Sequence, residues 1–237
     1  MIEAGLEFGD RQVDRVVAAF VALPPPLRPV HFSHEEHVVR PADQVEDRGR
    51  FSAFLAKSQS GFFLLGQGVT YSIRIATGRS LICDCFINVE PEVAKQFLIQ
   101  MSVAGPLFGF ACSPGEREHR NRVTTRQGVN TTESWVGRDT NRYIPGLYWL
   151  TLLSSALIEQ HGIALSALEA VARERIALEE GLNLFCFYER PEDWQKTSAV
   201  SELCSASPGI FDVDRIKPKL QAAKNFIELN SVLQNWK

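Results

Sequence analysis

The stretch NRYIPGLYWLTLLSSALIEQHG, residues 141–162, holds the densest apolar run of the chain. Pro145-Gly146 signals a turn or the entry to a helix, and Gly162 is well placed to end one. Between these signals the apolar residues recur at helical spacing, at Leu147, Leu150, Leu153 and Leu157. We therefore predict a buried central helix over residues 146–161. Its apolar part is shorter than the ~20 residues that a membrane span needs.

The composition is that of a globular protein with a substantial core. Hydrophobic residues make up 45% of the 237 residues and charged residues 22%, with a formal net charge of −3. This mildly acidic balance provides no broad basic field for nucleic acid. Residues 1–7 lack the pattern of a secretory signal, and no apolar run reaches membrane length. We expect a cytoplasmic protein that binds neither nucleic acid nor a membrane and carries no cofactor.

The cysteines do not suggest a disulfide framework, because they are scattered and odd in number. Cys83 and Cys85 lie two apart, which places them on the same face of a strand. We expect buried free thiols at the five positions, which are Cys83, Cys85, Cys112, Cys186 and Cys204.

The pattern along the chain predicts an α+β fold, with one mixed, mostly antiparallel sheet packed by helices. Residues 30–38 are expected to be extended or to form a short strand with a turn. Further strands are expected at 62–65, 70–76, 81–87, 107–112, 123–126, 131–136, 173–179 and 182–188. Helices are expected at 10–23, 45–58, 90–103 and 165–172, with a loop at 198–209. Asp10 is expected to cap the first helix, and Thr77-Gly78 and Gln127–Asn130 to form hairpin turns. We predict a single domain over residues 1–237, with an N-terminal helix in 1–26 and a C-terminal helix in 210–237 packing on it.

His31, His34 and His37 are the best candidates for metal ligands. Their spacing is three, whereas the helical zinc signature H-E-x-x-H places its histidines four apart. No cysteine lies nearby to complete a soft site. Surface or capping histidines are the simpler interpretation, and we expect no metal.

Nucleophilic catalysis has one candidate, Cys112, with His119 nearby in sequence. A Cys–His pair needs spatial proximity and a third, orienting group, and the sequence identifies neither. The motifs of serine hydrolases, phosphate loops and dinucleotide sites are absent. A small metal- or thiol-dependent hydrolase is therefore the alternative hypothesis, and not the leading one.

One local basic cluster stands out, interleaved with Glu116 and Glu118. It consists of Arg117, Arg120, Arg122 and Arg126, with His119. Because it contains no aromatic side chain on which a base could stack, we interpret it as a solvated helix face.

The segment 133–143 has the composition of a partner-binding surface, since Trp, Tyr and Arg are the usual anchors of protein interfaces. The candidate partner-binding residues in it are Glu133, Trp135, Arg138, Asp139, Arg142 and Tyr143. The alternative is a capped loop, with Asp139 or Asn141 capping a turn and Trp135 in the core.

The order of features resembles a known family. A helix, a Pro break, a Phe-rich helix and strands with Tyr-Ser-Ile-Arg at 71–74 precede the Tyr-Ile-Pro-Gly-Leu-Tyr-Trp stretch at 143–149. Over about residues 30–190 this order resembles the immunity proteins encoded beside bacterial polymorphic toxins. The group most similar is paired with restriction-endonuclease-like nuclease toxins, some of them delivered by type VI secretion.

The resemblance implies an inhibitor, without catalytic residues, that binds a cognate toxin in the cytoplasm of the producing cell. Inhibitors of nucleases often present acidic surfaces to a cationic cleft. Asp43, Glu46 and Asp47 form one candidate patch of this kind, although solvated charges are the simpler interpretation. A structural or adaptor domain without a toxin partner is a third hypothesis.

Overall fold

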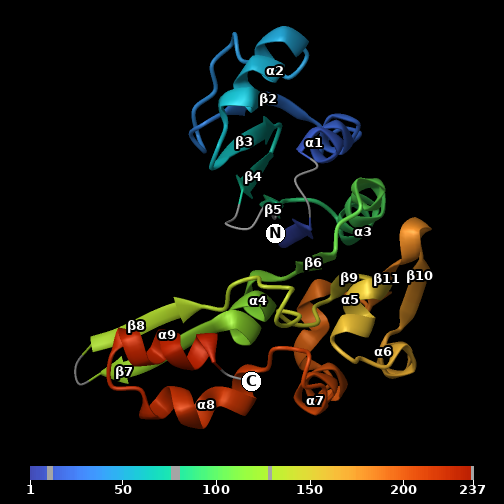
Figure 1. The fold of residues 1–237 in the computed structure, drawn as a ribbon. Helices are drawn as coiled ribbons and strands as arrows, with labels where there is room; N and C mark the ends of the chain where they lie inside the picture. Colours follow the sequence, from blue (N-terminus) through green and yellow to red (C-terminus); the bar gives the residue numbers. More distant parts are fainter. Residues whose placement is uncertain (10–12, 76–80, 128–129, 236–237) are drawn as a thin grey trace.

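Nine strands form one antiparallel sheet in the computed structural model, which describes residues 1–9, 13–75, 81–127 and 130–235 (Figure 1). Side chains of 125–127, 130 and 132 are outside this description. The strands of the main sheet are β1 (Ile2–Phe8), β2 (Pro29–Ser33), β3 (Gly61–Gly66), β4 (Val69–Ile75), β5 (Leu81–Ile87), β6 (Phe108–Cys112), β9 (Leu150–Ser154), β10 (Glu174–Ala177) and β11 (Leu182–Cys186). Their order is β10-β11-β9-β6-β1-β5-β4-β3-β2. A separate hairpin consists of β7 (Arg122–Gln127) and β8 (Asn130–Trp135).

Nine α-helices surround the sheet in the described part of the chain, so the α+β class is confirmed. They are α1 (Val13–Val21), α2 (Arg48–Lys57), α3 (Pro91–Met101), α4 (Pro114–Asn121), α5 (Ser155–Gln160), α6 (Leu165–Val171), α7 (Ala199–Ala206), α8 (Val213–Ala222) and α9 (Phe226–Gln234). Short 3₁₀ turns are η1 (Ser102–Ala104), η2 (Glu179–Gly181) and η3 (Pro191–Gln195). In the described residues, no helix is long and apolar enough to cross a membrane.

Strand β1 lies at the centre of the sheet, between β5 and β6. Its residues alternate in the way that a central strand requires, because the even-numbered side chains, Ile2, Ala4, Leu6 and Phe8, are at most 3% exposed. The odd-numbered positions carry Glu3, Gly5 and Glu7 on the other face. Residues 2–8 of the N-terminal segment 1–26 are therefore a strand, and the helix expected at 10–23 is found as α1.

Helices α1 and α3 cover the apolar face of the sheet (Figure 1). Phe20 of α1, Tyr71 of β4 and Phe97 of α3 form an aromatic cluster whose ring centroids lie 4.6–6.4 Å apart. Cys83 and Cys85 are buried, and Cys85 is paired with both Ala4 and Tyr71, so it points to this same face. Four of the five thiols are buried as expected, and Cys186 is half-buried. Asp10, the expected cap of α1, is outside the described residues.

The meander β2–β5 forms one half of the sheet and agrees with the strands expected there. Phe32 of β2 packs against Phe51 and Phe54 of α2, with ring centroids 5.1 and 4.5 Å away. The expected Thr77-Gly78 turn between β4 and β5 lies outside the described residues. So does the turn at 128–129, although the hairpin β7–β8 that it would join is confirmed.

The predicted central helix over 146–161 is wrong, and it is replaced by an extended segment, a strand and a short helix. Residues 144–149 are not helical, β9 follows, and α5 begins only at Ser155. The backbone N–H of Tyr148 donates to the Thr151 hydroxyl, and that of Trp149 donates to a Glu116 carboxylate oxygen. Strand β9 is buried on both faces between β6 and β11, and such a continuous apolar run cannot be told from a buried helix by periodicity.

The C-terminal region also differs from expectation. Residues 199–206 form α7 where a loop was predicted, and the single tail helix is divided into α8 and α9. Asn225 separates the two and caps α9, because its side chain accepts from the Glu228 N–H at 2.9 Å. Both helices pack on the β7–β8 hairpin and form a second small hydrophobic cluster there with Val123 and Tyr143. The expected helix at 165–172 and the β10–β11 hairpin are confirmed.

Ser154 marks the start of α5, and its replacement tests the boundary between strand and helix. Its hydroxyl accepts from the Leu157 N–H at 3.1 Å. We expect Ser154→Ala to lower the free energy of unfolding by about 1 kcal/mol in urea titrations. The exposed Ser166→Ala inside α6 is the control and should change it by less than about 0.5 kcal/mol. Equal or higher stability of Ser154→Ala would favour a helix that starts earlier, where Ala is the better residue.

Candidate functional site

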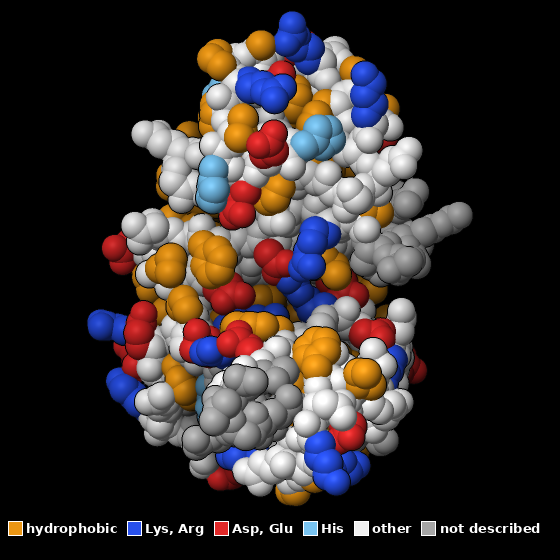
Figure 2. Space-filling model, turned by 90° about the vertical axis from the view of Figure 1, so that its left-hand side faces the viewer, with side chains coloured by type: hydrophobic (Ala, Val, Ile, Leu, Met, Phe, Trp, Pro, Cys, Tyr) orange, Lys and Arg blue, Asp and Glu red, His pale blue; other side chains and the backbone are white. Residues whose placement is uncertain are grey.

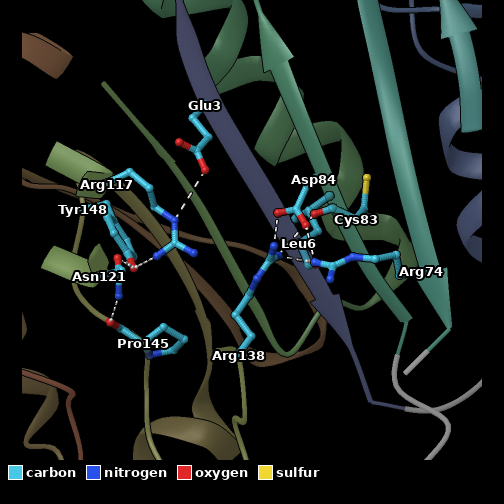
Figure 3. A network of polar contacts seen from close by, with 10 residues as sticks. All are labelled: Glu3, Leu6, Arg74, Cys83, Asp84, Arg117, Asn121, Arg138, Pro145 and Tyr148. Carbon is cyan, nitrogen blue, oxygen red and sulfur yellow. Dashed lines mark hydrogen bonds and ion pairs between the residues drawn. The ribbon is translucent and has the colours of Figure 1, made fainter. Parts of the chain in front are cut away.

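The face of the sheet opposite α1 and α3 is hollowed and charged. Figure 2 views the molecule from the left-hand side of Figure 1 and shows Lys, Arg, Asp and Glu side chains gathered in a hollow between the upper and lower parts. On this sheet face the register places Gly5 of β1 between Asp84 of β5 and Phe110 of β6. The polar contacts around these three residues form the candidate site (Figure 3).

Arg138 contributes a buried charge to the site, with a side chain only 4% exposed. Its guanidinium pairs with one carboxylate oxygen of Asp84 and lies 3.3 Å from the Cys83 carbonyl oxygen (Figure 3). The other oxygen of Asp84 accepts from Arg74 at 2.8 Å. One carboxylate therefore holds two guanidinium groups, and its ion pair with Arg138 compensates much of the cost of burying that charge.

Gly5 makes the close approach of Arg138 possible. A Cβ atom built at this position would lie 2.7 Å from Nη1 of Arg138 and 2.5 Å from Cε1 of Phe110. The ring of Phe110 makes cation–π contacts with two arginines, since Cζ of Arg117 lies 5.0 Å and Cζ of Arg138 5.6 Å from the ring centroid. The space that a side chain at position 5 would fill is thus taken by Phe110 and Arg138, which are distant from Gly5 in the sequence.

Arg117 joins helix α4 to the central strand and to the segment before β9. Its guanidinium donates to the Tyr148 hydroxyl at 3.0 Å, and that hydroxyl donates to Asn121 at 2.7 Å (Figure 3). Asn121 in turn donates to the Pro145 carbonyl at 2.8 Å. The contact with Glu3 is longer, with 3.5 Å between Nε and Oε1. Arg117 therefore has one good hydrogen bond and one loose ion pair.

Arg120 and Glu116 of α4 form a second buried ion pair. The Arg120 Nε donates to Glu116 at 3.1 Å, and another nitrogen of Arg120 donates to the Tyr188 hydroxyl at 2.9 Å. Burial raises the pKa of Glu116 to about 7, while Arg120 and the Trp149 N–H act to lower it. Arg117 and Arg120 are 6% and 8% exposed, so the interpretation of this basic cluster as a solvated helix face is wrong for both. Arg122 is exposed, and the Arg126 side chain is outside the described part.

Glu7 is the second carboxylate of the central strand on this face, and it is 4% exposed. Its Oε1 accepts from the Thr140 hydroxyl at 2.8 Å, whereas its buried Oε2 has no hydrogen-bond partner among the described residues. Desolvation raises the pKa of Glu7, and the hydrogen bond from Thr140 opposes this. The contact attaches the segment that contains Arg138 to β1 at a second point.

Two large aromatic side chains are exposed beside the charges. Phe86 of β5 is 54% exposed and Trp135 of β8 is 45% exposed. The indole N–H of Trp135 donates to Glu133 at 2.9 Å, and Arg122 donates to the other oxygen of Glu133 at 2.7 Å. An exposed aromatic side chain with its polar atom already bonded presents its apolar faces to a partner.

The partner-binding residues predicted in segment 133–143 come together in part. The Arg138 side chain is buried in the site. Tyr143 is buried against Phe211, and its hydroxyl donates to the Gly137 carbonyl at 2.9 Å. Asp139 and Arg142 are 4.0 Å apart. Together with Trp135, Tyr143 and residues of α9, they line a surface pocket of about 720 Å³. Trp135 and Glu133 are exposed on the hairpin.

The predicted acidic patch lies by α2, at the other end of the molecule from β7–β8 (Figure 1). Asp47 caps α2, because its side chain accepts from the Arg50 N–H at 3.1 Å. Asp43 lies 3.9 Å from the Arg50 guanidinium, and Glu46 is exposed. These are the ordinary contacts of a helix start and its solvent face.

The residues proposed for metal or thiol chemistry lie on β2 and the loop after it, and on β6 and α4. Among the described residues, no group of three or more His, Cys, Asp or Glu side chains could hold a metal ion, which includes His31, His34 and His37. His34 packs on Phe54, with ring centroids 4.4 Å apart. Cys112 is buried, which raises the pKa of its thiol.

Sequence reasoning missed Glu3, Arg74, Asp84 and Phe86, and set Arg117 aside. The signal that was available is the alternation of residues 2–8, where two carboxylates and a glycine occupy one face of an otherwise apolar strand. Comparisons with models of protein families, with curated proteins and with solved structures found no match. The site is therefore interpreted from its own geometry.

Replacement of Gly5 tests the packing over the central strand. We expect Gly5→Ala to lower the free energy of unfolding by about 1–3 kcal/mol, because the new methyl group overlaps Phe110 and the Arg138 guanidinium. Gly137→Ala is the matched control, since a Cβ there meets no atom within 4 Å. Equal stabilities of the two variants in urea would contradict the close approach.

The pH dependence of stability tests the buried state of Glu7. Its raised pKa means that the folded protein holds this proton more tightly than the unfolded chain does. This contribution to stability is complete below the unfolded pKa, about 4.3, and is lost as the pH rises through the native pKa. We expect stability to fall less between about pH 4.5 and pH 8 in Glu7→Gln than in the wild type, by urea titration. Glu118→Gln, on the exposed side of α4, should follow the wild type.

Proposed function

We propose that this chain is an immunity protein that binds and neutralises a cognate secreted antibacterial toxin, and so protects the cell that produces both. The toxin class is a nuclease, delivered to competitors by type VI secretion or a related route. In this proposal the chain acts in the cytoplasm as a stoichiometric inhibitor and needs no metal, cofactor, nucleic acid or membrane. The function then depends on a protein-binding surface.

The observation that carries the proposal is the hollow on the open sheet face. Two exposed aromatic side chains, Phe86 and Trp135, accompany charged groups that are held in place by buried ion pairs. Aromatic and Arg side chains on a preorganised surface are typical of the residues that dominate binding energies at protein interfaces. The order of sequence features that resembles immunity proteins supports the same class.

The arrangement of charges suits binding more readily than turnover. Arg74 and Arg138 are both paired with Asp84, and Arg117 is paired with Glu3 and bonded to Tyr148. Such pairs keep the surface close to neutral and rigid, which lowers the entropy cost of forming a complex. The partner would therefore find these charged side chains already in place.

Co-expression with the product of the neighbouring toxin gene tests the proposal. We expect the toxin to kill a bacterial host on its own, and the host to survive when this chain is present. The two proteins should co-purify in fixed stoichiometry and elute together in size-exclusion chromatography. Survival should require the complex, so Gly5→Ala, which distorts the hollow, should protect less well than Gly137→Ala. Toxicity without rescue, or rescue without a complex, would contradict the proposal.

A further inference from the structure

We propose that Glu3 binds an arginine or lysine side chain of the partner protein. The bound cation would lie between the exposed rings of Phe86 and Trp135. The inference rests on the proposed function, since it names the chemistry of the partner at the same surface. It commits to a protein with an exposed cationic side chain, such as a nuclease that uses such residues to hold nucleic-acid phosphates.

The geometry places Glu3 between the two aromatic side chains. Glu3 and Phe86 are direct partners in the antiparallel ladder of β1 and β5, so their Cα atoms are about 4.5–5.5 Å apart and their side chains share one face. On its other side Glu3 contacts Arg117, whose Cζ lies 6.0 Å from the ring of Trp135. The order across this surface is therefore Phe86, Glu3, Arg117 and Trp135.

Glu3 has the least satisfied carboxylate of the surface. Asp84 is bonded through both oxygens, to Arg74 and Arg138. Both oxygens of Glu133 are also bonded, to Arg122 and Trp135. Among the side-chain contacts of the described residues, Glu3 has only the 3.5 Å ion pair with Arg117. A partner could supply the donors that its carboxylate lacks.

The electrostatic environment of Glu3 favours an additional cation. Its side chain is only 17% exposed, and desolvation raises its pKa although Arg117 and Arg138 act in the opposite direction. A mostly buried carboxylate with one loose ion pair gains more from a second cation than an exposed carboxylate does, because less water screens the interaction. The remaining exposure still leaves a path for a partner side chain.

The aromatic neighbours define the kind of cation. A guanidinium or ammonium group can bond a carboxylate through its N–H groups and be attracted to the faces of aromatic rings. Phe86 and Trp135 are exposed on either side of the Glu3–Arg117 pair. Arg is favoured over Lys here, because its planar group stacks on rings and bonds carboxylates in a fork. By taking a phosphate-binding side chain, the surface would compete directly with nucleic acid.

Affinity for the purified cognate toxin tests the proposal, measured by titration calorimetry with the full-length chain. We expect Glu3→Gln to weaken binding roughly 10- to 100-fold, and Phe86→Ala and Trp135→Ala each roughly tenfold or more. Two controls remove similar groups elsewhere on the surface: Glu36→Gln by β2 and Phe226→Ala on α9, which is 53% exposed. Both should bind within about twofold of the wild type.

Salt separates a direct charge contact from a structural effect of Glu3. The loss caused by Glu3→Gln should shrink between about 50 and 500 mM salt, because salt screens the partner's cation at this partly exposed carboxylate. Wild-type affinity for Glu3→Gln, or a loss that is equal at both salt concentrations, would overturn this inference while leaving the proposed function intact. If the wild-type chain itself binds no toxin, the proposed function fails first, and this inference falls with it.

Discussion

The burial of the Arg138 guanidinium above the central strand is the constraint on which the rest of the site depends. A charge that is 4% exposed is tolerated because Asp84 and two backbone carbonyl groups surround it. Gly5 is required beneath it, and Phe110 beside it. The segment that carries Arg138 is thereby attached to β1 and β5, and the Glu7–Thr140 contact attaches it again nearby. The hollow keeps its shape because its floor and one wall are joined by these charges.

The two faces of the sheet follow different physical rules. On the α1 and α3 side, apolar burial dominates, with Phe20, Tyr71 and Phe97 at its centre. Polar contacts are also present there, because Tyr71 donates to the Leu27 carbonyl at 2.7 Å and Lys95 of α3 pairs with Glu174 of β10. On the other face, hydrogen-bonded charges connect α4 and the segment before β9 to β1. Such contacts offset the cost of desolvating the charged groups only when their geometry is specific. They therefore fix the positions of the side chains more strictly than apolar packing does. A binding surface benefits from that strictness, since its groups are in place before a partner arrives.

Sequence patterns predicted the meander strands and also the buried strand β6, and they missed β1 and β9. The meander strands β3, β4 and β5 and the helix α3 could be recognised from alternation, turns and a Pro at the helix start. Strand β9 could not, because burial on both faces removes the alternation that distinguishes a strand. The candidate site was recognised only in part, through Trp135 and Arg138. Its other members, such as Glu3 and Asp84, are separated by 81 positions, and only the strand register brings them together.

The strand order also determines when the sheet can form during folding. Strand β1 is the only strand that joins the β2–β5 half of the described sheet to the half formed by β6, β9, β10 and β11. It precedes the other strands of the described sheet along the chain, yet its two neighbours are β5 and β6, which lie roughly 80 and 105 positions further on. Until residues 108–112 have emerged, one edge of β1 has no partner within its own sheet. We therefore expect slow folding that is dominated by long-range pairing, with an interval during synthesis in which the nascent chain benefits from a chaperone.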